Sequence, residues 1–173
     1  MVKVAAAIDK LNAQVGRVTM WLALLMILVQ FMVVVLRYVF GISYIFMQES
    51  IIYMHGIMFM AAAGFALLQD AHVRVDIFYS AASERTKALI NLLGAFIFLL
   101  PFCVVVFYFS YPYVANAWEV MEGSPETSGI QGVYLLKSMI LVFCVLVALQ
   151  GVSLAIHSYL RFTGHEPLPA ARE

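Results

Sequence analysis

The stretch that decides the fold is VTMWLALLMILVQFMVVVL, residues Val18–Leu36, which contains no Asp, Glu, Lys or Arg. A helix rises about 1.5 Å per residue and the hydrocarbon core of a bilayer is about 30 Å thick, so about 20 apolar residues cross it. Three further uncharged stretches of sufficient length follow, at Ser50–Leu68, Ala88–Trp118 and Ser138–Leu160. Because lipid offers the backbone no hydrogen-bond partner, each stretch is expected to be a helix.

Composition agrees with a membrane protein, since 64% of the residues are hydrophobic and 12% are charged, against roughly 25% charged residues in soluble domains. The formal net charge of zero argues against a nucleic-acid partner, which would require a basic excess. We predict one all-α integral membrane domain over residues 1–173, with a disordered tail at 163–173. Its four spans are expected at about 18–36, 46–68, 88–112 and 136–160.

Two prolines subdivide the long third stretch. Pro101 is expected to kink it. Pro112, flanked by Tyr111 and Tyr113, is expected to mark its exit into the headgroup region, where aromatic side chains gather.

The first stretch follows Lys3, Lys10 and Arg17, as the apolar core of a signal peptide would. It is longer than such a core, which has about 7–15 residues, and no small-x-small cleavage site follows it. We therefore interpret it as an uncleaved span.

Basic residues predict the orientation, because they concentrate in cytoplasmic segments. The N-terminal segment, the middle connection and the C-terminal tail contain Lys3, Lys10, Arg17, Arg74, Arg85, Lys87, Arg161 and Arg172, whereas the other two connections contain Arg37 and Lys137. Both termini are therefore expected in the cytoplasm. Val4, Ile8, Leu11 and Val15 recur at helical spacing before the first span, which predicts an amphipathic helix that lies on the cytoplasmic interface and runs into the first span. A frayed N-terminus is the alternative.

The sequence contains no recognisable catalytic or cofactor-binding pattern. Cys103 and Cys144 lie in apolar runs without a Cys-x-x-Cys motif, so they are interpreted as buried thiols. His55 and His157 are expected at different depths, which disfavours a shared haem. No metal-ligand spacing or phosphate-binding loop is present either. An enzyme is not expected.

A carrier acting alone usually places ionisable side chains deep in the membrane, and no span has an acid or a base at its centre. The polar residues inside the spans are Gln30, His55, Asn91, Gln150 and His157. Each is expected to hydrogen-bond a neighbouring helix, and small residues such as Ala62 with Ala66, and Gly151 with Ala155, offer close-packing faces. These features indicate an accessory or scaffold subunit.

The segment from Arg37 to Asp76 resembles the small membrane (Q, or DctQ-like) subunit of tripartite ATP-independent periplasmic (TRAP) transporters. The matching residues are Arg37-Tyr38-x-Phe40, Glu49, Gly64-Phe65-Ala66-Leu67 and His72-Val73-Arg74-Val75-Asp76, with a weaker match at Gly129, Lys137 and Gln150.

The resemblance implies a location in the bacterial inner membrane and three kinds of partner: a large membrane subunit that carries substrate and sodium, a periplasmic substrate-binding protein, and membrane lipids. The substrate would be an organic acid, and this chain would anchor the large subunit without a cofactor of its own, sodium coupling being expected in the partner. The alternative is a standalone homodimeric small channel or multidrug carrier. It would need a membrane-embedded acid, and Glu49 comes nearest to one.

Five charged or ionisable residues are the structural and interaction candidates: Arg37, Glu49, His72, Arg74 and Asp76. Arg37 and Glu49 close either end of a short connection and are expected to pair, with Glu49 in the first turn of its helix. Alternatively, Arg37 faces outward and docks the periplasmic protein. His72, Arg74 and Asp76 are expected to order the cytoplasmic connection, the alternative being a plain solvated loop.

Overall fold

The computed structural model describes residues 1–72, 79 and 82–165, and nearly all of them lie in helices. The helices are α1 (Val2–Val39), α2 (Ile45–Leu68), α4 (Glu84–Gly94), the π-helix η1 (Ala95–Leu99), α5 (Leu100–Glu119) and α6 (Val133–Phe162). Since α4, η1 and α5 follow one another directly, they form one helical rod of 36 residues. Four helical rods are thus long and apolar enough to cross a membrane, which confirms the predicted all-α, four-span fold.

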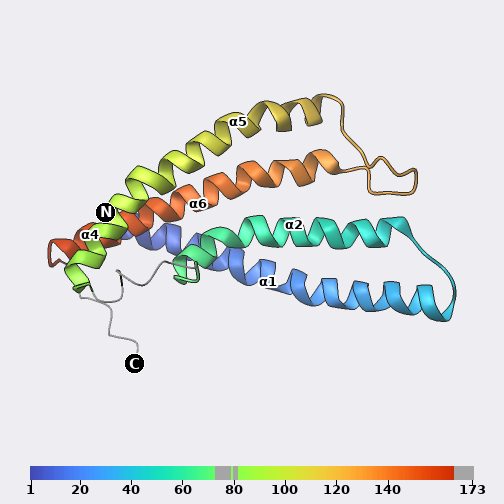
Figure 1. The fold of residues 1–173 in the computed structure, drawn as a ribbon, viewed down its shortest axis with the longest axis horizontal. Helices are drawn as coiled ribbons and strands as arrows, with labels where there is room; N and C mark the ends of the chain where they lie inside the picture. The colour runs from blue at the N-terminus through green and yellow to red at the C-terminus, as the bar shows by residue number, and fades with distance from the viewer. Residues whose placement is uncertain (73–78, 80–81, 166–173) are drawn as a thin grey trace.

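The rods pack as two antiparallel hairpins, α1 with α2 and α5 with α6 (Figure 1). Helix α6 is the centre of the packing, because it contacts α1, α2, α4 and α5. In the most apolar 18-residue window of α6, 39% of the residues are buried, against 6% to 11% in the other three rods. The core therefore runs along α6, while the remaining rods expose most of their apolar surface.

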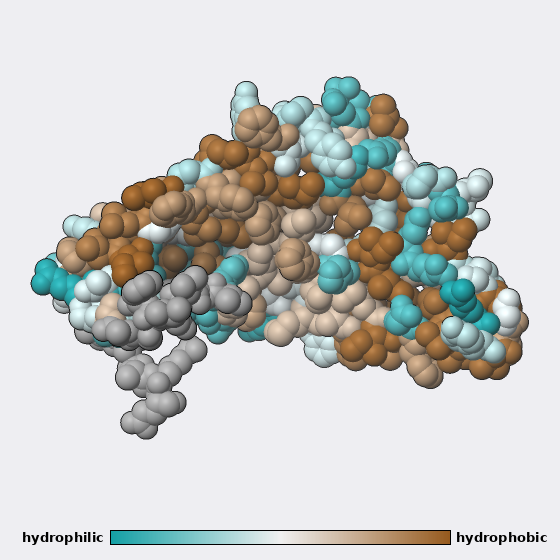
Figure 2. All heavy atoms as spheres, viewed as in Figure 1, coloured by the Kyte–Doolittle hydropathy of each residue, from teal (hydrophilic) through white to brown (hydrophobic). Residues whose placement is uncertain are grey.

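The two ends of the molecule differ in charge. The start of α1, helix α4 and the end of α6 meet at one end (Figure 1), which we call the basic end because it contains Lys3, Lys10, Arg17, Arg85, Lys87 and Arg161. The α1–α2 and α5–α6 connections form the opposite, acidic end, which contains Glu49, Glu119, Glu122 and Glu126 beside Arg37 and Lys137. Apolar residues dominate the middle of the face shown in Figure 2, as expected of a protein surrounded by lipid.

Helix α1 is continuous over 38 residues, about 57 Å, so its N-terminal part is not a separate helix. This part packs on the other helices through Ala5, Ile8, Asn12, Gly16 and Thr19. This packing face differs from the predicted apolar stripe, in which Ile8 is buried but Val4 is 55% exposed and Leu11 is 44% exposed. Small side chains form the buried face because they let the helix backbones approach closely.

The third rod contains both prolines. Pro101 is the second residue of α5, two residues beyond the π-helix η1. The wider turn of η1 suits a residue that has no N–H and whose ring crowds the preceding turn. Pro112 lies inside α5, so the helix does not end at the predicted exit into the headgroup region. The helix continues to Glu119 because Val114 and Ala117 are buried beyond the proline.

The α1–α2 connection begins with a glycine cap. Gly41 has a φ of +70°, a conformation that residues with a Cβ rarely adopt. The Ile42 N–H then donates to the Leu36 carbonyl over 3.0 Å, which satisfies a carbonyl group in the last turns of α1. The other end of the chain, where the tail was predicted, is described as far as residue 165; the remainder lies outside the described residues.

Candidate functional site

A cluster of polar side chains joins α1 to α6 at the basic end. It consists of Asp9 and Asn12 from α1 and of Gln150, Ser153 and His157 from α6; we call it the basic-end cluster. Asp9 Oδ1 accepts hydrogen bonds from Ser153 Oγ over 2.6 Å and from Gln150 Nε2 over 2.9 Å. Asp9 Oδ2 lies 3.0 Å from His157 Nε2. One carboxylate therefore gathers three side chains from successive turns of α6.

Asn12 extends the cluster toward the middle of the molecule. Its side-chain amide donates to Gln150 Oε1 over 2.9 Å, and Asn12 and Ser153 are completely buried. Asn12 Oδ1 has no hydrogen-bond partner in the described chain, and it faces Gly64 of α2, where a Cβ would collide with it. The absence of a side chain at Gly64 thus lets three helices converge at Asn12.

The basic-end cluster is suited to holding helices together. Intramolecular hydrogen bonds contribute about 0.5–1.5 kcal/mol each, and more when one partner is charged. Among the described residues, no group of three His, Cys, Asp or Glu side chains could hold a metal ion. The prediction that Gln150 and His157 bond a neighbouring helix is confirmed.

Sequence reasoning missed the role of Asp9 and Asn12. It searched this segment for large apolar residues and did not single out either of the two. The signal was present in the spacing of Ala5, Asn12, Gly16 and Thr19, a face of small and polar residues that recurs at helical intervals and is typical of close packing between membrane helices.

A second cluster, the acidic-end cluster, fixes the α5–α6 connection onto α2. The Glu49 carboxylate accepts a hydrogen bond from Ser124 Oγ over 2.5 Å and another from the backbone N–H of Ile130 over 2.6 Å. The Tyr53 hydroxyl, one turn along α2, donates to the Ile130 carbonyl over 3.2 Å. One face of α2 therefore holds both ends of this loop.

The predicted pair between Arg37 and Glu49 is not formed. No ion pair joins these two residues, both of which lie in the described part of the chain, and Arg37 is exposed. Helix α2 begins at Ile45, so Glu49 lies in the second turn and not in the first. Glu49 is directed toward the α5–α6 loop. An N–H and a hydroxyl of this loop bind its carboxylate, which was expected to bind the guanidinium of Arg37.

A third set of contacts ties α5 to α6 near the same end. Lys137 forms an ion pair with Glu122 over 2.5 Å, and its ammonium lies 4.0 Å from the centre of the Tyr113 ring. The Trp118 indole N–H donates to Ser138 Oγ over 2.8 Å. These contacts explain why α5 runs past Pro112.

The remaining candidates are scattered. His72 is exposed just beyond α2, while Arg74 and Asp76 lie outside the described residues. Gln30 and His55 are exposed on the surfaces of α1 and α2, and neither makes a hydrogen bond within the described chain. For these two residues, the described chain provides no hydrogen bond to a neighbouring helix.

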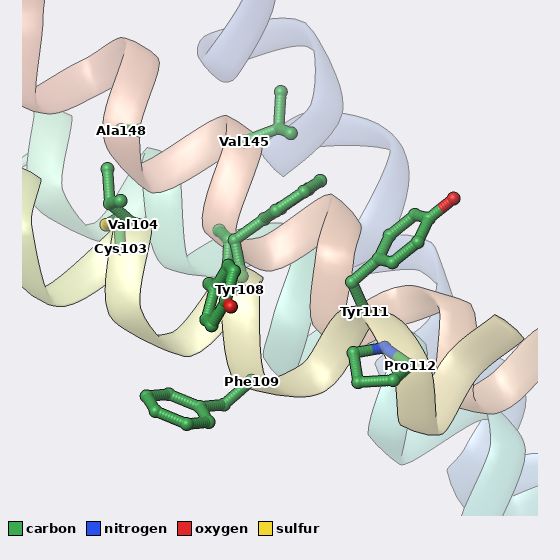
Figure 3. Close-up of a pocket in the computed structure, with 10 residues that line it drawn as sticks. Cys103, Val104, Tyr108, Phe109, Tyr111, Pro112, Val145 and Ala148 are labelled. Carbon is green, nitrogen blue, oxygen red and sulfur yellow. The ribbon is translucent and has the colours of Figure 1, made fainter.

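An apolar groove of about 690 Å³ lies between α5 and α6 (Figure 3). Cys103, Val104, Tyr108, Pro112, Cys144 and Ala148 are among its lining residues. Both cysteines are free and buried, as predicted. None of the residues that line the groove carries a charged side chain.

Fold and clusters together define a class: a small helical membrane protein whose buried polar groups join its own helices. The family model of the tripartite ATP-independent periplasmic transporters, DctQ component, matches residues 26–161. The chain belongs to this family, whose members are the small membrane components of TRAP transporters. Comparison with curated proteins and with solved structures gives no match.

Proposed function

We propose that this chain is the scaffold subunit of a TRAP transporter and anchors the large subunit that translocates an organic acid together with sodium. The observation that carries the proposal is that carboxylates of this chain are hydrogen-bonded within the chain. Asp9 and Glu49 each bind groups of the chain itself, so neither is free to hold a substrate. An anchored counterpart of a moving subunit needs apolar surface and rigid helices, and does not need a substrate site.

Exposed apolar surface supports the same function. The most apolar windows of three rods are between 6% and 11% buried, which leaves wide faces for lipid and for a second membrane subunit. Large exposed apolar patches mark membrane or protein contacts. A periplasmic substrate-binding protein completes the proposed assembly, and Arg37, exposed at the acidic end, is one candidate for contacting it.

The proposed location is the bacterial inner membrane, with the basic end and both termini in the cytoplasm. The basis is the concentration of Lys and Arg at the basic end, together with the tendency of such residues to stay on the cytoplasmic side. His72, Arg74 and Asp76 would then belong to the cytoplasmic connection. We propose that they order it.

A standalone channel or multidrug carrier is less well supported. It would require an acid open to a cargo ion, whereas both oxygens of Glu49 accept hydrogen bonds from the α5–α6 loop. The groove between α5 and α6 is lined mainly by apolar and aromatic side chains and contains no carboxylate.

Reconstitution into proteoliposomes tests the scaffold function. Vesicles containing this chain, the co-encoded large subunit and the periplasmic protein should take up substrate along a sodium gradient. Vesicles with this chain alone should take up none. Uptake by this chain alone would contradict the proposal, and so would uptake of equal rate and stability without it.

A further inference from the structure

His55 is an ionisable side chain that is exposed within the membrane-spanning helix α2, in the half nearer the acidic end. It lies about 15 Å from the start of α2 and about 20 Å from its end, at 1.5 Å per residue. The described chain gives it no hydrogen bond; its contact is a stacked arrangement with the Phe59 ring, with the ring centres 6.2 Å apart. By contrast, Asn12, Gln150 and Ser153 are buried and hydrogen-bonded.

Such a placement is costly against lipid. Polar and ionisable side chains inside membranes almost always face other protein or a water-filled cavity, since hydrocarbon offers them no partner. No other described residue hydrogen-bonds His55, which is exposed. A partner for the imidazole therefore has to come from outside the described residues.

The surroundings of His55 form a continuous helix face. Ile52 and Phe59, one turn to either side, are 61% and 64% exposed. Ala62 and Ala66 continue the same line at spacings of three and four residues, which places them on one side of the helix. We call the line Ile52, His55, Phe59, Ala62 and Ala66 the α2 face. Its partner must be apolar along its length and polar at the depth of His55.

We propose that the α2 face is the surface against which the large membrane subunit packs, through a transmembrane helix that brings a hydrogen-bonding group to His55. This inference rests on the proposed function, which supplies the partner. A helix of that subunit satisfies both requirements of the α2 face, whereas lipid tails satisfy the apolar one alone. A single polar residue within an apolar helix contact also fixes the register of the two helices.

Site-specific photo-crosslinking in the co-expressed transporter tests the assignment. A photoreactive amino acid replaces Ile52 or Phe59 in one pair of variants and Val104 in a control. Val104 is 66% exposed on α5, so it is a matched position on another face. Crosslinks to the large subunit are expected from positions 52 and 59 and not from 104.

Substitution of His55 provides a second readout. His55→Leu is expected to weaken association with the large subunit roughly threefold, the effect of one hydrogen bond between membrane helices. His55→Gln should retain association, because it keeps a hydrogen-bonding group. The melting temperature of this chain alone should not change, since His55 has no hydrogen bond within it. Tyr108→Leu, at an exposed position of α5, is the control and should leave association unchanged.

The outcomes separate the two claims. Crosslinks from position 104 alone, or from positions 52 and 59 to lipid or to a second copy of this chain, overturn the α2 face while leaving the scaffold function intact. Equal association of His55→Leu and the unsubstituted chain also overturns it. If the large subunit does not co-purify at all, the scaffold function fails and the inference fails with it.

Discussion

The Ser153 hydroxyl donates a 2.6 Å hydrogen bond to the carboxylate of Asp9, although the two residues are 144 positions apart. The bond brings the first turns of the chain against its last helix. Together with Gln150 and His157 on the same carboxylate, it makes the basic-end cluster the closure of the fold. The first prediction follows from it.

Asp9→Ala should destabilise the chain by about 1–3 kcal/mol, because Ser153 and Gln150 are left without their acceptor in a buried region. Thermal unfolding in detergent measures the loss. Lys10→Ala, at the adjacent exposed position, is the control and should change stability by less than about 0.5 kcal/mol. The double variant with Ser153→Ala should lose less than the sum of the two single losses, because the residues are in contact. Additive losses would mean that the bond contributes nothing.

Gly64→Ala should also destabilise the chain, by about 1–3 kcal/mol for overpacking. The new Cβ would meet Asn12 Oδ1, and it would lie 3.1 Å from the Leu146 carbonyl oxygen. Gly94→Ala provides the contrast, because nothing lies within 4 Å of the Cβ it adds. In that helical position alanine is favoured over glycine by about 0.5–1 kcal/mol. Similar melting temperatures for the two variants would argue against close contact at Gly64.

Glu49→Gln should loosen the α5–α6 loop, since two hydrogen bonds to a charged acceptor, each worth about 1.5–3 kcal/mol, are weakened. Hydrogen exchange of the Ile130 amide should become faster. Glu126→Gln, on the same loop but exposed, is the control. Combining Arg37→Glu with Glu49→Arg should not restore protection, because the two residues do not pair. Restoration by this charge swap would show that they do.

The sequence was sufficient for the parts of the fold that depend on lipid. Uncharged stretches of about 20 residues predict spans because the bilayer sets their length, and all four are present. Hydrogen bonds between residues far apart in the chain could not be predicted from the sequence. Glu49 had one charged candidate nearby, Arg37, whereas its partners are a hydroxyl at Ser124 and a backbone N–H at Ile130. Backbone donors carry no sequence signature, so no pattern could identify them.

The buried face of α1 was missed for a related reason. A search for a large apolar stripe selected Val4 and Leu11, which are exposed. Buried faces between membrane helices are formed by small residues, and Ala5 and Gly16 are of this kind. Proline breaks isolated helices, but α5 continues past Pro112 because Val114 and Ala117 are packed beyond it.

Orientation in the membrane is open to a direct labelling test. A cysteine replacing Ser128, exposed in the α5–α6 connection, should react with a membrane-impermeant maleimide added to intact spheroplasts. A cysteine replacing Thr163, exposed at the end of α6, should react only after permeabilisation. The native Cys103 and Cys144 are buried and should stay unlabelled. The opposite pattern would place the termini outside.

The central claim is that this chain works as a scaffold bound to one larger membrane subunit. Native mass spectrometry of the tagged chain, purified after co-expression with that subunit, tests it most directly. The account predicts a complex whose mass is that of one large subunit plus one 19.3 kDa chain. A lone monomer or a homodimer of this chain, with the large subunit expressed but absent from the complex, would contradict it.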